Sequence, residues 1–327
     1  MRKALGLIYL LAALVTVACL WEYFNKGGVV NFVSPANLRN VLTWVGLFGI
    51  LSLGQAIVII TGGIDLSVGS VVALIGITTA VLFSQGYPPA LVLPGVLLLA
   101  AAIGAFHGAL VTKARMQPFI VTLCGLFFYR GVARYIAQDT TQGFGTEYTA
   151  LKWFGRGYIP TESSLLPAPF AVFLALAAAV GVYLHLTPQG RRLFALGANE
   201  EAARFSGIRT DRLKILAYAL CTTLAAFGGL LFAFKVNSLG PGDFGNFYEL
   251  YAVAGAVLGG CSLRGGSGNV LGVVIGASLI MVLRNLVNIL EIPSELEYVV
   301  IGGAILIGVF ADQWMSRRRE MGGAGAA

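Results

Sequence analysis

The feature that most constrains the fold is a series of long apolar segments that recurs along the whole chain. A helix needs about 20 predominantly apolar residues to cross a bilayer. Only 11% of the residues are charged, against about 25% in soluble domains. A water-soluble fold could not bury this much apolar surface, so we expect an all-α, polytopic membrane bundle that forms a single transmembrane domain over residues 1–327. Ten candidate spans cover residues 4–22, 41–61, 68–86, 90–111, 118–137, 166–186, 214–234, 248–262, 269–290 and 296–313.

The distribution of basic residues tests this number of spans. If the N-terminus lies inside and the chain alternates, 14 of the 22 Lys and Arg residues fall in the inside segments. Cytoplasmic loops carry such an excess, so the pattern predicts ten spans with both termini in the cytoplasm, including a basic C-terminal tail at 314–327. The net charge of +7 is then explained by membrane topology, and we expect no nucleic-acid partner.

Two glycine-rich segments interrupt the apolar pattern and predict broken helices. The first is 61–70 and includes Gly63, Asp65, Leu66, Ser67 and Gly69; the second is 258–268. An ionisable residue beside a span indicates a functional site, but Asp65 is also placed to cap the helix that starts near Ser67 or Val68. Paired breaks of this kind flank transport pathways.

The inside loop at 187–213 is long and is not a flexible Gly/Ser linker. Asn199 is placed to cap a short helix over 200–205, with an acidic pair in its first turn and Gly207 after its end. A short capped helix of this kind is suited to binding a partner protein.

Motifs for catalysis or metal binding do not occur in the sequence. There is no phosphate-binding G-x-x-x-x-G-K-[ST] loop, no G-x-S-x-G, no H-E-x-x-H, and no zinc-ligand spacing among the four cysteines. We therefore expect a non-enzymatic transport subunit without a cofactor or metal, whose energy comes from a separate partner.

Three amides within the predicted spans are candidates for a polar pathway: Gln55, Asn285 and Asn288. The two asparagines are three residues apart and share a helix face. Hydrogen bonding between helices is the alternative role for each amide. Arg284 lies in the same span, where a charge is costly unless it faces a wet cavity or a partner.

Four blocks in order along the chain resemble the permeases of ribose- and xylose-type bacterial ABC importers. They are TGGIDLSVGS at 61–70, QPFIVTL at 117–123 followed by Arg130 and Gly131, ALGANEEAARFSGI at 195–208, and YEL at 248–250 followed by VLGG at 257–260 and LRGGSG at 263–268. Arg284 departs from the family pattern, where many relatives carry an amide, and so does the aromatic run 127–129.

The resemblance implies a permease of the bacterial inner membrane that carries a monosaccharide, a ribose-like pentose or a hexose. It implies a cytoplasmic ABC ATPase, a periplasmic or lipid-anchored sugar-binding protein, and a second permease copy, identical or not, as partners. It also places the ATPase contact at Gly197, Asn199, Glu200, Glu201, Ala202, Ala203, Ser206 and Gly207. The alternatives are a permease for a nucleoside, an autoinducer-like sugar or a branched-chain amino acid, and a stand-alone secondary carrier.

Overall fold

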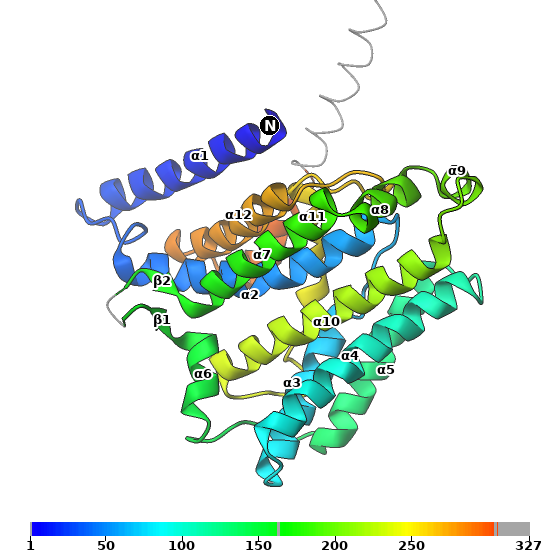
Figure 1. The fold of residues 1–327 in the computed structure, drawn as a ribbon. Coiled ribbons are helices and arrows are strands. Elements are labelled where there is room, and N and C mark those ends of the chain that lie inside the picture. The colour runs from blue at the N-terminus through cyan, green and yellow to red at the C-terminus, as the bar shows by residue number, and fades with distance from the viewer. Residues whose placement is uncertain (1, 162–163, 304–305, 307–327) are drawn as a thin grey trace, which may run out of the picture.

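A computed structural model describes residues 2–161, 164–303 and 306 of the chain (Figure 1). Seven of its helices are long and apolar enough to cross a membrane. They are α1 (Arg2–Asn25), α2 (Pro35–Ile60), α4 (Pro89–Thr112), α5 (Pro118–Ala137), α7 (Ala168–Leu186), α10 (Thr210–Val236) and α12 (Val270–Ile289). Two shorter apolar helices, α3 (Val68–Ser84) and α11 (Tyr248–Leu258), complete the bundle.

Proline at the first turn sets the start of several of these helices. Pro35, Pro89, Pro118 and Pro188 each occupy such a position, where the missing N–H has no intrahelical partner and the fixed φ suits a helix. Ser34 also caps α2 by accepting a hydrogen bond from the backbone N of Asn37. Residues next to these helix starts therefore determine where the helices begin.

Helix α2 forms the centre of the bundle. Its most apolar window is 94% buried, whereas the corresponding windows of α4, α5 and α7 are each 28% buried. α7, α10, α11 and α12 pack around α2, and α1 lies at the periphery against α12 (Figure 1). Apolar character does not by itself assign this central position, since α4 is as apolar as α2 but far less buried.

The remaining elements lie at the two ends of the bundle. α8 (Pro188–Ala198) and α9 (Glu200–Phe205) lie at one end, and α6 (Thr149–Arg156) lies at the other (Figure 1). The strands β1 (Tyr158–Ile159) and β2 (Leu166–Pro167) pair antiparallel, and a single 3₁₀ turn (Ser294–Leu296) follows α12.

Both predicted breaks are confirmed. α2 ends at Ile60 and α3 begins at Val68, with Gly62 at a φ of +79° between them. α11 ends at Leu258, short of the predicted 262, because Gly259 and Gly260 end the helix there. Nine of the ten predicted spans thus correspond to helices, with shifted ends. The tenth, 296–313, lies mostly outside the described residues, as does the tail 314–327.

Candidate functional site: a capped helix near two helix breaks

The predicted capped helix is present as α9 and is held by ion pairs. Asn199 Oδ1 accepts a hydrogen bond from the backbone N of Ala202 at 2.9 Å, as its cap role requires. Glu200 pairs with Arg204 at 3.3 Å and with Lys214 of α10 at 2.6 Å. The pair between Glu200 and Lys214 ties α9 to the start of α10.

The outer face of α9 carries an aromatic ring that the sequence analysis did not single out. Phe205, its last residue, is 91% exposed. A phenylalanine at the tip of a structured, charged helix leaves a large apolar surface unburied. The signal available in the sequence was an aromatic residue at the end of the short charged helix.

Helix α8 meets both breaks through backbone atoms. Gly266 N donates a hydrogen bond to Ile60 O at 2.9 Å, and Gly197 packs directly on this pair. A Cβ at position 197 would overlap Ile60 O and lie 2.5 Å from Gly266 N. We call Gly197, Ile60 and Gly266 the glycine junction; it joins α8 to the first break at the end of α2 and to the second break before α12.

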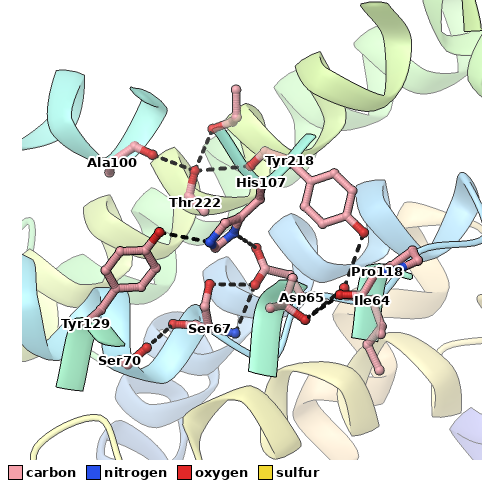
Figure 2. A network of polar contacts seen from close by, with 12 residues as sticks. Ile64, Asp65, Ser67, Ser70, Ala100, His107, Pro118, Tyr129, Tyr218 and Thr222 are labelled. Carbon is pink, nitrogen blue, oxygen red and sulfur yellow. Dashed lines mark hydrogen bonds and ion pairs between the residues drawn. The ribbon is translucent and has the colours of Figure 1, made fainter. Parts of the chain in front are cut away.

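Beyond the junction, the first break is organised around Asp65, which is fully buried (Figure 2). Its Oδ1 accepts hydrogen bonds from Ser67 N at 2.9 Å and Ser67 Oγ at 2.6 Å, and so holds the turn that leads into α3, whose N-cap residue is Ser67. Its Oδ2 faces His107 Nδ1 of α4 at 4.0 Å, and His107 Nε2 is 2.9 Å from Tyr129 Oη of α5. The break therefore connects α3, α4 and α5.

Further polar groups hold the same segment in place (Figure 2). Tyr218 of α10 donates to Ile64 O at 3.3 Å, and Gln55 of α2 bonds to the backbone N and O of Asp65. The sequence analysis did not connect His107, Tyr129 or Tyr218 with Asp65. Since His107 is an ionisable residue within a span, it could have been flagged as functional.

The signature residue Gly69 has a steric role on α3. A Cβ at this position would overlap a carboxylate oxygen of Glu249 and the carbonyl oxygen of Gly245. Glu249 itself is 6% exposed at the start of α11. Nearby, Arg130 of α5 donates to Phe244 O at 2.6 Å and to Pro241 O at 3.2 Å. This arrangement ties the segment before α11 to α3 and α5.

The three candidate pathway amides occupy different environments. Gln55 is fully buried against the first break, and Asn285 is clasped to Asn37 of α2 by two amide hydrogen bonds of 2.8 and 2.9 Å. Asn288 is exposed and donates to Arg284 O at 3.2 Å. A pathway role remains a prediction for all three, and Gln55 and Asn285 also bond between elements.

Arg284 lines a cavity and also forms an ion pair. Its Nε lies 3.0 Å from Glu297 Oε1, and its guanidinium lies 5.5 Å from the ring of Trp44 and 5.8 Å from that of Tyr251. It also lines a small cavity of about 120 Å³ between α2 and α12. Within the described part of the chain, no group of three or more His, Cys, Asp or Glu side chains is placed to hold a metal ion.

Comparisons with known proteins agree with this architecture. Residues 37–309 match the profile of a family described as the branched-chain amino acid transport system, permease component. The chain is 38% identical to the ribose import permease protein RbsC of Bacillus subtilis, over 86% of each chain. It is 35% identical to RbsC of Haemophilus influenzae, over 88% of each chain. The xylose transport system permease protein XylH of Escherichia coli K12 is 29% identical, over 96% of this chain and 93% of that protein. No solved structure shows a significant match.

Proposed function

This chain belongs to the permease family of branched-chain amino acid transport systems, in which it resembles ribose and xylose permeases, and from that premise we propose that it is the membrane subunit of a monosaccharide ABC importer. The observation that carries the proposal is the 38% identity to a ribose import permease over 86% of the chain. The chain is a multi-pass inner-membrane protein and a transport subunit.

We further propose the partners that such a subunit requires. An ABC ATPase binds at the end of the bundle that carries α8 and α9, a sugar-binding protein docks at the opposite end, and a second permease copy completes the complex. The α8–α9 end is then cytoplasmic, as are both termini. Basic residues that gather at this end support the orientation, among them Lys113, Arg191, Arg192 and Arg204.

Helices α8 and α9, which we call the coupling unit, offer a physical route from the ATPase to the membrane. We propose that the ATPase grips α9 through the surface formed by Gly197, Asn199, Glu200, Glu201, Ala202, Ala203, Ser206 and Gly207, with Phe205 as an additional anchor. α9 is capped and ion-paired, so it moves as a rigid piece. The glycine junction passes that movement to Ile60 and Gly266, and so to both helix breaks.

Reconstitution tests the proposal directly. The purified chain alone is expected to hydrolyse no ATP, because it has no phosphate-binding loop. Proteoliposomes that also contain the ATPase and the binding protein encoded with it are expected to take up labelled D-ribose or D-xylose only when ATP is supplied. Leucine serves as the competing substrate. ATP hydrolysis by the chain alone, or uptake of leucine in place of sugar, would contradict the proposal.

A second prediction concerns Phe205. Since this ring is 91% exposed, Phe205→Ala is expected to leave the thermal stability of the isolated permease unchanged. Truncating an aromatic anchor costs an interface about 2 kcal/mol, so the affinity for the ATPase should fall roughly thirtyfold. Tyr87→Ala is the matched control, since Tyr87 is 48% exposed at the opposite end of the bundle. Equal ATPase affinity in a pull-down titration of wild type and Phe205→Ala would remove Phe205 from the interface.

A further inference from the structure

A cavity between α2 and α12 lies at the end of the bundle opposite the coupling unit. It is lined by Asn40, Val41, Trp44, Met281, Arg284, Asn285 and Asn288. Since α2 reaches the glycine junction at Ile60 and rises 1.5 Å per residue, Asn40 lies roughly 30 Å from that junction. This distance is about the thickness of the hydrocarbon core, so the cavity sits where a substrate would enter from outside.

The cavity lining has an apolar side and a polar side, which match the apolar face and the hydroxyl groups of a sugar ring. Val41, Trp44 and Met281 form an apolar wall, which suits the C–H face of a pyranose or furanose. The other side is polar: the guanidinium of Arg284 has five N–H donors, of which Nε–H is directed at Glu297. Asn40 and Asn288 are both exposed at the cavity. Asn40 Oδ1 accepts a hydrogen bond from Trp44 Nε1, and Asn288 Nδ2 donates one to Arg284 O, and each amide keeps a further donor and acceptor for hydroxyl groups.

The charge balance selects a neutral ligand over an amino acid. The 3.0 Å ion pair with Glu297 compensates the charge of Arg284, and the seven lining residues include no carboxylate. A zwitterionic amino acid would require an uncompensated cation for its carboxylate and an acidic group for its ammonium. A neutral polyol requires neither, and the donors and acceptors of this cavity match it.

Trp44, in the cavity wall, packs against a cluster of buried aromatic rings. Phe48 packs 4.9 Å from Phe232 and 5.0 Å from both Tyr248 and Tyr251, measured between ring centroids. Phe48 and Phe232 are 1% and 0% exposed, so solvent does not reach the rings next to Trp44. A sugar in the cavity could pass these rings only if the helices that carry them moved.

We propose that this cavity is an entry subsite for a neutral monosaccharide, in which Asn40, Arg284 and Asn288 bind the hydroxyl groups and Trp44 contacts the ring. The inference rests on the proposed function and deepens it by placing the substrate. With a volume near 120 Å³, far below the roughly 300–1,000 Å³ of sites that enclose ligands, the subsite contacts only part of a sugar, and we expect weak binding. Weak binding suits conduction, because the sugar must also leave. Asn285 acts here as a brace, since its amide is bonded to Asn37.

Uptake by the complete importer tests the subsite. The permease is expressed with its ATPase and binding protein in cells that lack their own ribose and xylose uptake, and initial rates are measured with labelled D-ribose and D-xylose. Asn288→Leu and Asn40→Leu are expected to lower the maximal rate about tenfold by removing hydroxyl-binding groups. The KM should stay unchanged, because the binding protein sets it. Asn288→Gln keeps the amide and should restore most of the rate.

The controls separate the subsite from folding and from the proposed function. Asn31→Leu, at an exposed asparagine outside the cavity, should transport at the wild-type rate. Asn288→Cys should react with a membrane-impermeant maleimide in intact cells, and the imported sugar should slow that reaction. If wild type imports sugar and both Asn288→Leu and Asn40→Leu import it at the wild-type rate, the subsite is wrong and the importer function stands. If wild type imports leucine and neither sugar, both are wrong.

Discussion

Gly197→Ala is expected to abolish ATP-driven sugar uptake while the permease still inserts into the membrane. A Cβ at this position would overlap Ile60 O and approach Gly266 N to 2.5 Å. These are backbone atoms of two helix breaks, so no side-chain rotation can relieve the clash. Overpacking of this kind costs about 1–3 kcal/mol or more, and α8 must shift away from the junction. We expect uptake to fall by more than about tenfold, a loss of at least 1.4 kcal/mol in coupling.

The matched control for this variant is Gly131→Ala. Gly131 also lies within a helix, α5, but a Cβ there meets no atom within 4 Å. Alanine favours a helix over glycine, so this variant should transport normally. Asn199→Ala removes the cap of α9, worth about 1 kcal/mol, and should impair coupling less than Gly197→Ala. The measurements are sugar uptake and ATP hydrolysis in proteoliposomes; coupled uptake by Gly197→Ala at the wild-type rate would refute the role of the glycine junction.

The second large effect is expected for Asp65→Ala. This change removes the acceptor of two hydrogen bonds from Ser67 and leaves His107 facing an apolar group in the interior. Each buried donor left without a partner costs about 1–3 kcal/mol, so the folded permease should lose roughly 3 kcal/mol or more. We expect a lower melting temperature in detergent and loss of uptake.

Asp139→Ala provides the comparison for Asp65→Ala. Asp139 pairs with Arg134 at 2.7 Å on the exposed surface, where an ion pair contributes little to stability. Its melting temperature should match wild type. An Asp65→Ala permease that melts at the same temperature as Asp139→Ala would show that the buried network around Asp65 does not support the fold.

Some features of this site could be predicted because they depend on neighbours in the chain. The cap at Asn199 acts on Ala202, and Asp65 acts on Ser67, so residue type and spacing were sufficient. The helix breaks follow from glycines that end one helix before the next begins. Arg284 was correctly expected to need a partner, but nothing in the pattern identified Glu297.

Other features could not be predicted because they join segments far apart in the sequence. Asn37 and Asn285 pair between α2 and α12, and Gly197 meets Ile60 and Gly266 by backbone contact. No periodicity connects such positions. In a membrane, lipid is as apolar as a helix surface, so association depends on close packing and hydrogen bonds that hydropathy does not record.

The sequence by itself determined that this protein spans a membrane, where its helices break, and that a short capped helix projects at one end. These properties depend on composition and on contacts within one or two turns. Only the tertiary structure decided that α2 is central while α4, equally apolar in pattern, is peripheral, with 94% and 28% of their apolar windows buried. Only the tertiary structure also showed that α8, next to the capped helix, contacts both breaks, because this contact depends on which backbones approach closely. Position 197 requires glycine because Ile60 lies against it, and the sequence alone does not show that contact.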